Sequence, residues 1–518
     1  PATTVWSYGS VDFPGTVVEG GSFNYPAFTI EAKWRSPVRV KWINDLVDES
    51  GGFLPHLLPV DQTLHWANPP GACKDGTTGT DCRGSDPTEY TGPVPMIVHV
   101  HGAETYECSD GYPEAWYLPA ANNIPGDYFT GGSFFDTFES QALSEGGLAW
   151  EPGSATFEYP NEQAAATLWY HDHTLGMTRQ NVYAGPAGFF LLRGGPGDAV
   201  YDSRGKPAQL PGPAPALGDP PGIDYYEIPI AIQDRSFNED GALFYPDNRA
   251  FFEGLEPEQL QIPFIPDDVI YQGPTNLGPS DVSPIWNPEF FGNMIVVNGK
   301  TWPYLEVEQR RYRLRLLNGS QSRFLILKMD NGTPFWQIGA EQGFLPEPVR
   351  LDELLMGPAE RADVIVDFGD VPEGTEIILL NLGPDEPFGG GTPGEDFDPA
   401  DPGSTGQVMK FVVVKRKGAD KSTPPDELVL PAPPVLGPAN STRQISLNEE
   451  ESATVRVTED DDGNIVLDLD GEVFGPTEAL LGTLVGGSGN PLKWSDPTTE
   501  NPGVGDTEVW EIYNFTAD

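Results

Sequence analysis

Residues 98–102 (VHVHG) and 169–173 (WYHDH) carry the most information about the fold of this chain. Together they hold four of its six histidines, arranged as two His-x-His pairs. Successive side chains of a strand point to opposite faces, so the two histidines of a pair share one face, while Val100 or Asp172 points away. Each pair therefore offers two imidazoles to one place. Neutral imidazole binds copper, zinc, iron and nickel, so the pattern predicts a metal site on paired strands.

The rest of the chain is also typical of β-structure. The 518 residues include 60 glycines and 54 prolines, which favour short strands joined by turns over helix bundles. Apolar and β-branched runs of strand length recur along the sequence and predict an all-β protein. The main runs are 28–32, 38–43, 95–100, 165–170, 189–192, 226–232, 294–297, 312–317, 324–327, 362–368, 408–414 and 508–514.

Two segments rich in proline and glycine interrupt these runs, and neither can hold a central strand. They divide the chain into five predicted parts: a first domain 1–195, a linker 196–224, a second domain 225–415, a linker 416–440 and the start of a third unit, 441–518. Within the third unit, the acidic turn 461–464 predicts a hairpin.

The charge balance excludes two classes of partner. There are 29 basic and 78 acidic residues, for a formal net charge of −49, which disfavours binding to nucleic acid or to anionic membranes. No stretch of sequence is long and apolar enough to span a bilayer. We interpret the charge first as an adaptation for solubility, such as solubility at high salt, and second as a means of attracting cations.

Cys73 and Cys82 flank the loop 74–81, which has no hydrophobic residue to hold it in place. A disulfide between them would supply that constraint, although three cysteines permit three pairings. Cys108 would then be a small buried hydrophobe. A disulfide favours an oxidising compartment, so we expect a secreted, periplasmic or cell-surface protein.

Residues 98–116 (VHVHGAETYECSDGYPEAW) and 168–192 (LWYHDHTLGMTRQNVYAGPAGFFLL) resemble the first two copper motifs of the multicopper oxidases. The similarity is greatest to the branch that contains spore-coat laccase, phenoxazinone synthase and bilirubin oxidase. Shorter matches lie at 41–44, 54–66, 297–299, 313–318 and 357–364. The resemblance implies an all-β chain of serial cupredoxin-like, Greek-key β-sandwich domains, with the third incomplete here.

The resemblance also implies a role for each paired histidine. His99 would bind the lone type 2 copper, and His101, His171 and His173 would bind the paired type 3 coppers. In such enzymes electrons enter at a type 1 copper held by a cysteine, two histidines and usually a methionine. They are then used at the three-copper cluster to reduce O2 to water.

The family's third motif, H-P-x-H-x-H, and its fourth, H-C-H, have no counterpart in these residues. Only His56 and His65 remain, and neither adjoins a cysteine. Residues 510–518 (WEIYNFTAD) resemble the strand and turn that precede the third motif. We therefore expect a second polypeptide, from the same precursor or another gene, to complete the third domain and carry the type 1 copper.

Three further residues have two interpretations each. Asp110 matches an acidic residue on the family's dioxygen path and would relay protons, or it opens an Asx-turn before Gly111. His56 and His65 are interpreted as core or surface histidines, with contacts to the ligand histidines as the alternative.

These observations predict a laccase-like multicopper oxidase that oxidises phenols or aminophenols. One alternative is an oxidase of Mn(II) or another metal ion, because an acidic surface concentrates cations. The other is a non-catalytic copper-binding or coat protein that has kept the scaffold.

Overall fold

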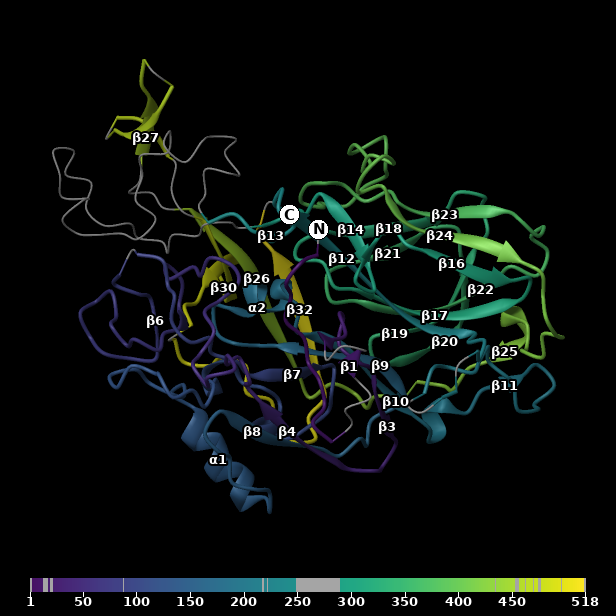
Figure 1. The fold of residues 1–518 in the computed structure, drawn as a ribbon, viewed down its shortest axis with the longest axis horizontal. Helices are drawn as coiled ribbons and strands as arrows, with labels where there is room; N and C mark the ends of the chain where they lie inside the picture. The colour runs from purple at the N-terminus through teal and green to yellow at the C-terminus, as the bar shows by residue number, and fades with distance from the viewer. Residues whose placement is uncertain are drawn as a thin grey trace.

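The structure is a computed structural model of the chain, shown in Figure 1. It describes residues 2–12, 17–18, 22–86, 88–216, 219–220, 222–247, 289–433, 435–451, 456–461, 463–468, 470–473, 477–494 and 496–516. Strands dominate these residues, and the fold is all-β with few helices. In this part of the chain, no helix is long and apolar enough to cross a membrane.

The first group of strands contains both His-x-His pairs. Its main sheet has the order β3-β10-β9-β7, and β4 pairs with β8, β5 with β6, and β1 with β2. The strands are β1 (Val17–Val18), β2 (Ser22–Phe23), β3 (Ile30–Lys33), β4 (Val38–Ile43), β5 (Trp66–Ala67), β6 (Asp81–Cys82), β7 (Val98–His101), β8 (Ser154–Tyr159), β9 (Ala166–Asp172) and β10 (Ala187–Arg193). The helices are η2 (Glu107–Ser109), η3 (Pro113–Ala115), α1 (Phe135–Ser144), α2 (Thr178–Ala184) and η4 (Pro196–Asp198).

The second group is a two-sheet sandwich. One sheet has the order β15-β14-β12-β17-β22-β19-β20, with β13 paired to β12, and the other has the order β16-β24-β23-β18-β21. The strands are β12 (Glu227–Phe237), β13 (Leu243–Phe244), β14 (Met294–Val297), β15 (Lys300–Thr301), β16 (Tyr304–Glu308), β17 (Arg311–Asn318), β18 (Leu325–Met329), β19 (Phe335–Ala340), β20 (Gly343–Leu351), β21 (Leu354–Met356), β22 (Arg361–Asp367), β23 (Glu376–Asn381) and β24 (Gln407–Val414). Their inward side chains form one buried core, to which both sheets contribute.

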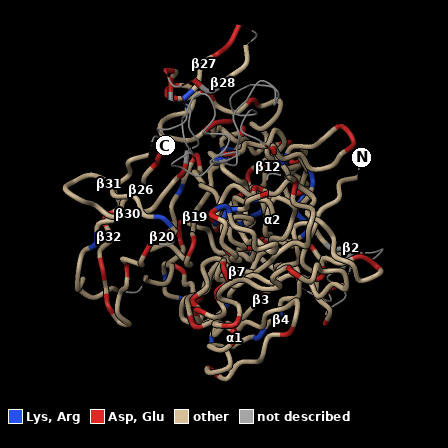
Figure 2. Tube along the Cα trace, turned by 90° about the vertical axis from the view of Figure 1, so that its left-hand side faces the viewer, with Lys and Arg blue, Asp and Glu red and all other residues tan. Residues whose placement is uncertain are grey.

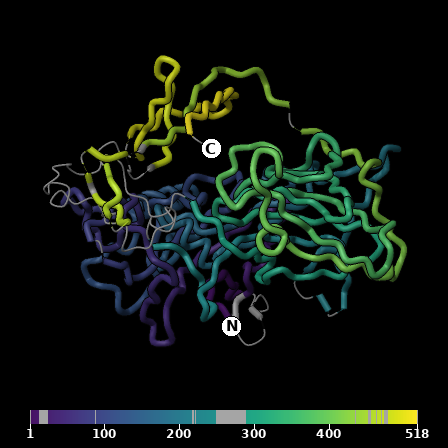
Figure 3. The backbone as a smooth tube through the Cα atoms, turned by 90° about the horizontal axis from the view of Figure 1, so that it is seen from above, coloured from purple at the N-terminus to yellow at the C-terminus, as the bar shows by residue number. Residues whose placement is uncertain are grey.

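The third group has a four-stranded sheet, β31-β30-β26-β32, and a three-stranded sheet, β28-β27-β29. The strands are β26 (Ser441–Glu451), β27 (Arg456–Glu459), β28 (Ile465–Leu467), β29 (Glu472–Val473), β30 (Thr477–Val485), β31 (Ser488–Pro491) and β32 (Glu508–Asn514). β27 and β28 pair antiparallel across the predicted hairpin, although residue 462 of its turn lies outside the described residues. Figure 3 shows this group beside the first one, and the Trp494 indole donates to Glu114 Oε1 at 3.0 Å between them.

The two predicted linkers run side by side. β11 (Tyr201–Asp202) in the first linker pairs antiparallel with β25 (Leu428–Val429) in the second, just after η6 (Pro425–Glu427). Strands β11 and β25 are each only two residues long, as expected in linkers so rich in proline.

Strand β9 is buried along its whole length, which explains its unbroken run of large side chains. On one face, Leu168 and Tyr170 join the core of the first group. On the other, Trp169 packs with Ala231 and Leu317 of the second group. By contrast, β4 alternates partly buried and exposed residues, because only one of its faces is covered. One face of β9 thus belongs to the core of the first group, and His171 lies on the opposite face.

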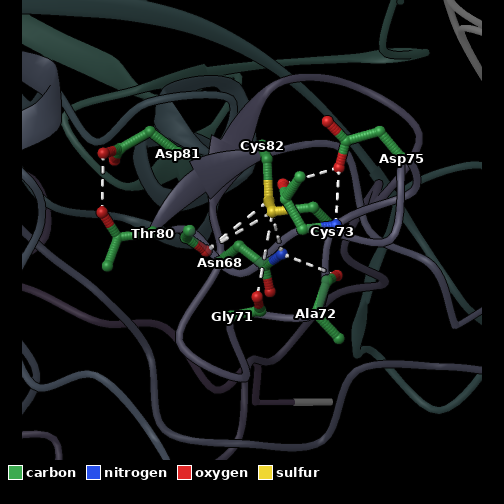
Figure 4. The surroundings of a disulfide bond; sticks show 10 residues. Asn68, Gly71, Ala72, Cys73, Asp75, Thr80, Asp81 and Cys82 are labelled. Atoms are coloured by element: carbon green, nitrogen blue, oxygen red, sulfur yellow. Dashed lines mark hydrogen bonds between the residues drawn. A yellow bond between two sulfur atoms is a disulfide. The ribbon is translucent and has the colours of Figure 1, made fainter.

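A disulfide joins Cys73 and Cys82, with their Cα atoms 5.6 Å apart (Figure 4). It closes the loop that the sequence left without hydrophobic anchors. Cys108 is a free, buried cysteine, and burial raises the pKa of its thiol. The sequence predicted this pairing of Cys73 with Cys82 and a buried, unpaired Cys108, and both predictions are confirmed.

Candidate metal centre

Both His-x-His pairs lie on neighbouring antiparallel strands of the first group. In the register of β7 and β9, His99 is directly opposite His171. His173 lies one residue beyond β9, and its backbone N–H donates to the Ile97 carbonyl at 2.8 Å. Because side chains alternate along strands, this pairing gathers the four imidazoles on the face opposite the first core.

The four rings form a compact cluster. The His99 and His173 rings are stacked with centroids 4.6 Å apart, and the other neighbouring pairs lie at 5.6–5.9 Å. One donor atom from each of His99, His101 and His171 lies within 4.8 Å of the other two. That group of three omits His173, which joins the cluster through its stack on His99. Trp169 packs against His171 with ring centroids 4.2 Å apart.

Backbone carbonyls fix the orientation of three rings. His99 Nδ1 lies 2.5 Å from the Asp110 carbonyl, His173 Nδ1 lies 2.8 Å from the Gly111 carbonyl, and His171 Nδ1 lies 2.6 Å from the Asp172 carbonyl. A carbonyl oxygen can only accept, so the hydrogen-bond network assigns the proton of each neutral ring to Nδ1. The lone pair of each Nε2 is therefore available to a metal ion.

Gly111 can occupy its position only because it has no side chain. Its φ is +80°, and a Cβ there would lie 2.2 Å from the Val98 carbonyl of β7. The turn at Asp110 and Gly111 therefore packs directly against the strand that carries the first pair, with two carbonyls available to the rings. Sequence reasoning missed these carbonyl anchors, and the Asp-Gly pair after the first motif was the signal for them.

His101 faces the cluster differently. Its Nδ1 lies 3.3 Å from Nε2 of His171, which carries no proton because the proton of that ring is on Nδ1. His101 Nδ1 donates this hydrogen bond and His171 Nε2 accepts it. A metal ion bound to His171 Nε2 would take the place of the bonded proton. Next to it, the Gly102 carbonyl accepts hydrogen bonds from Gln163 at 2.8 Å and Gln342 at 3.2 Å, the latter from the second group.

Burial keeps His101, His171 and His173 uncharged at neutral pH. It lowers the pKa of His101 to about 4, with smaller contributions from the nearby Arg361 guanidinium and the neighbouring histidines. Burial likewise lowers the pKa of His171 well below its usual value and also lowers that of His173. Neutral imidazole is the form that binds metal, so the site is electrostatically prepared for cations.

Asp172 points away from the cluster, as the strand alternation predicts. Its carboxylate is completely buried and accepts from the backbone N–H groups of Ile97 and Thr174, the Thr174 hydroxyl and the Asn181 amide. Burial raises the pKa of this carboxyl to about 6, although the four hydrogen bonds oppose that rise. The Asp172 carboxylate is thus a structural hydrogen-bond acceptor on the face of the strands opposite the four imidazole rings.

Of the three remaining candidate residues, only Asp110 lies beside a histidine of the cluster. The Asp110 carboxylate lies 3.4 Å from His99 Nδ1, and its side chain is 51% exposed. His56 is partly buried away from the cluster and packs edge-on against Trp6. His65 is exposed.

The donor set fits copper. Four imidazoles converge, and nearby carbonyls orient three of them so that the Nε2 atoms of His99 and His173 have free lone pairs, which is the environment that imidazole-bound Cu requires. More than one ion is consistent with donors up to 4.8 Å apart. In the part of the chain that the structure describes, this is the one group of three or more potential ligands.

Several curated proteins are similar to this chain over nearly its whole length. No family model matches the chain. The laccase of Bacillus stratosphericus is 34% identical over 517 residues, and that of Bacillus subtilis (strain 168) is 32% identical over 506. These alignments cover 100% and 98% of this chain and 73% of each relative. A laccase of Haloferax volcanii is 31% identical, over 97% of this chain and 65% of that protein.

Among solved structures, a multi-copper oxidase from Pediococcus acidilactici has a TM-score of 0.50 at 18% identity. The match covers 99% of this chain and 70% of that one, and it supports the cupredoxin-like fold alone. The identity to the Bacillus laccases, over nearly the whole chain, shows the family directly. The chain therefore belongs to the laccase-like multicopper oxidases, a family of copper-dependent oxidoreductases.

Proposed function

We propose that His99, His101, His171 and His173 hold half of a trinuclear copper cluster. His99 is assigned to the type 2 copper, and the other three to the type 3 pair. The convergence of the four rings on one face of β7 and β9 carries this proposal. Bound copper would supply the one-electron redox chemistry needed to reduce O2 to water.

The chain's own residues prepare this site before any metal arrives. The carbonyls of Asp110, Gly111 and Asp172 orient three rings, and burial keeps the rings of His171 and His173 neutral. A rigid, uncharged set of donors lowers the cost of ordering ligands around each ion. The residues present thus select and position the metal, and the redox chemistry belongs to the metal itself.

The other ligands of such a cluster must come from polypeptide outside these residues. Of the histidines left over, His56 is engaged with Asn181, and neither it nor His65 belongs to the group of potential metal ligands found in the described residues. Two of the three cysteines form a disulfide, and Cys108 is buried. We assign the missing ligands, and the type 1 copper, to polypeptide beyond these 518 residues, from the same precursor or from another gene, that carries H-P-x-H-x-H and H-C-H motifs.

The third group offers a surface for that polypeptide. Several large apolar side chains on or next to β30 and β32 are 37–66% exposed. Along β32, Trp510 and Ile512 lie on the opposite face from Val509 and Tyr513, so both faces expose apolar side chains. Large exposed apolar surface marks an interaction site more often than a solvated face. The residues are Leu481, Val485, Val509, Trp510, Ile512, Tyr513 and Phe515.

Asp110 is the proposed proton relay. Reduction of O2 to water consumes protons, and this half-exposed carboxylate lies between solvent and His99. Replacing it by asparagine should slow turnover while the copper content stays unchanged. A loss of copper would instead assign Asp110 a structural role.

Phenols and aminophenols are the proposed substrates, oxidised one electron at a time at the type 1 copper. Mn(II) or another metal cation is the second candidate, favoured by the net charge of −49. Figure 2 shows acidic residues in all parts of the fold, with few basic residues among them. The disulfide supports a secreted, periplasmic or cell-surface location.

One experiment tests the arrangement. The protein is purified from its source and examined by intact-mass analysis, denaturing electrophoresis, copper quantification and visible absorption. We expect bound copper, the blue thiolate-to-copper band and additional sequence carrying the missing motifs. A preparation that holds only these 518 residues and has no blue band would contradict the proposed assembly and favour a non-catalytic copper-binding protein.

A further inference from the structure

A directed chain of hydrogen bonds runs from His56 to the turn that follows the second His-x-His pair. The Leu58 N–H donates to His56 Nδ1 at 2.9 Å, and His56 Nε2 lies 3.0 Å from Asn181 Oδ1. The Asn181 amide nitrogen lies 2.9 Å from Asp172 Oδ2. Asn181 and Asp172 are completely buried.

The direction of each bond follows from chemistry. Asp172 accepts from two backbone N–H groups, so the Asn181 amide nitrogen faces it as a donor, and this nitrogen also reaches the Pro95 carbonyl at 3.2 Å. Asn181 Oδ1 therefore faces His56 and needs a donor. His56 supplies it as the Nε2–H tautomer. Its Nδ1 then accepts from the Leu58 N–H at 2.9 Å, while the Leu58 carbonyl, 3.0 Å from the same nitrogen, competes for a proton there. The fixed Asn181 amide decides between the two. Burial lowers the pKa of His56 to about 4, which keeps the ring neutral.

Asp172, at the end of this chain, ties the two metal-binding strands together. Its Oδ1 accepts from the Ile97 N–H, two residues before His99, and its Oδ2 accepts from the Thr174 N–H, next to His173. His173 lies beyond the last paired residue of β9, so its position depends on these contacts and on its own bond to the Ile97 carbonyl.

We propose that His56 and Asn181 are positioning residues for the copper site, acting through Asp172 on the strand entry at Ile97 and the turn at Thr174. His56 holds the Asn181 amide in the one orientation that directs its nitrogen at Asp172. If the amide flipped, an oxygen would face the carboxylate, and a buried acceptor would be left unsatisfied. The sequence left His56 as a core or surface histidine, with contacts to the ligand histidines as the alternative. In this proposal His56 instead stabilises the turn after the second His-x-His pair from behind, through Asn181 and Asp172.

This inference rests on the proposed copper site, so the test has a readout that needs no metal. The variants are His56→Leu, Asn181→Leu, their double mutant, and His56→Gln, which can still donate to Asn181. His65→Leu is the matched control, because His65 is exposed and outside the chain of hydrogen bonds. The metal-free variants of the full chain are compared by hydrogen–deuterium exchange of peptides that contain Ile97 and Thr174. Cu(II) affinity is then measured by competition with a chelator.

We expect faster exchange at Ile97 and Thr174 in His56→Leu and Asn181→Leu, no further change in the double mutant, and near-normal protection in His56→Gln and His65→Leu. Cu(II) affinity should fall by about 10-fold in the two leucine variants, the usual effect of losing a hydrogen-bond partner behind a ligand. Rescue by glutamine separates positioning from simple loss of packing.

Unchanged exchange in a folded His56→Leu protein would overturn the inference, and so would independent, additive effects of the two leucine variants. Failure of the unmodified protein to bind Cu(II) would instead contradict the proposed copper site, and the exchange data would still decide the positioning role. If His56→Leu does not fold, the comparison of Asn181→Leu with His56→Gln decides by the same criteria.

Discussion

His99 and His171 are directly opposite each other in neighbouring antiparallel strands, with ring centroids 5.6 Å apart. They belong to different His-x-His pairs, separated by about seventy residues of sequence. The register of two strands is therefore what turns two separate sequence motifs into one site. A slip of one residue would send one pair into the first core.

Removal of His171 should abolish normal metal binding, because its ring is the most buried of the cluster and faces His101 directly. We expect His171→Ala to weaken Cu(II) binding by more than about 100-fold, beyond the usual effect of losing an outer contact. The measurement is copper titration against a competing chelator, with His65→Ala as the control. Equal affinity in the two variants would place the copper elsewhere.

Gly111 should tolerate no side chain. In Gly111→Ala the new Cβ would meet the Val98 carbonyl and the residue would keep a positive φ, so we expect a loss of at least about 3 kcal/mol in the free energy of unfolding. Gly76→Ala is the matched control, because its φ is +79° and nothing lies within 4 Å of the new Cβ. Its loss should be about 1 kcal/mol. Urea unfolding measures both, and similar losses would mean that the turn can move away from β7.

The buried histidines should make the metal-free protein sensitive to mild acid. Below its ordinary pKa of 6.5, His56 takes up a proton in the unfolded chain but resists it in the folded chain until about pH 4. Its stabilising contribution is thus complete above pH 6.5 and declines as the pH falls toward 4. His101, also lowered to about 4, behaves the same way, while Asp172, raised to about 6, opposes the trend by taking up a proton in the folded state first.

Comparison with His56→Gln isolates one of these groups. Between pH 7 and pH 5 the unmodified protein should lose about 1–2 kcal/mol of unfolding free energy relative to the variant, since one proton is linked to unfolding. Urea unfolding at both pH values provides the measurement. A constant difference between the two proteins would show that His56 is not held neutral in the folded state.

Salt should stabilise this chain. With a net charge of −49, self-repulsion opposes the compact state, and ions screen it. The Debye length falls from about 10 Å at 0.1 M to about 3 Å at 1 M, so most of the increase in Tm should be complete by about 1 M KCl. Thermal melts in KCl, compared with betaine at equal osmolality, separate screening from solute exclusion. A Tm that responds equally to both solutes would contradict this explanation.

Much of the fold was accessible from local sequence. Residues 38–43 alternate apolar and charged side chains and form the half-buried strand β4, while residues 166–172 show no alternation and form β9, covered on both faces. The short helices α1 and α2 were not predicted. They lie in segments that connect the predicted strands.

The site itself was only half accessible. The two His-x-His spacings identified the four imidazoles, because alternation along a strand is a local property of the backbone. The carbonyls of Asp110 and Gly111 were not predicted, since the Asp-Gly pair indicates a turn but not which carbonyl faces which ring. The contact of His56 with Asn181 joins residues 125 positions apart.

The sequence by itself therefore determined the family and most of the strands, and it singled out the four histidines proposed as copper ligands, because periodicity and motif spacing are encoded residue by residue. Only the tertiary structure decided which ring faces which, which ring nitrogen is free, and which distant residues contact Asp172 behind the histidines. Those depend on strand register and on how α2 and the loop at His56 pack behind β9, and such long-range contacts leave no local pattern.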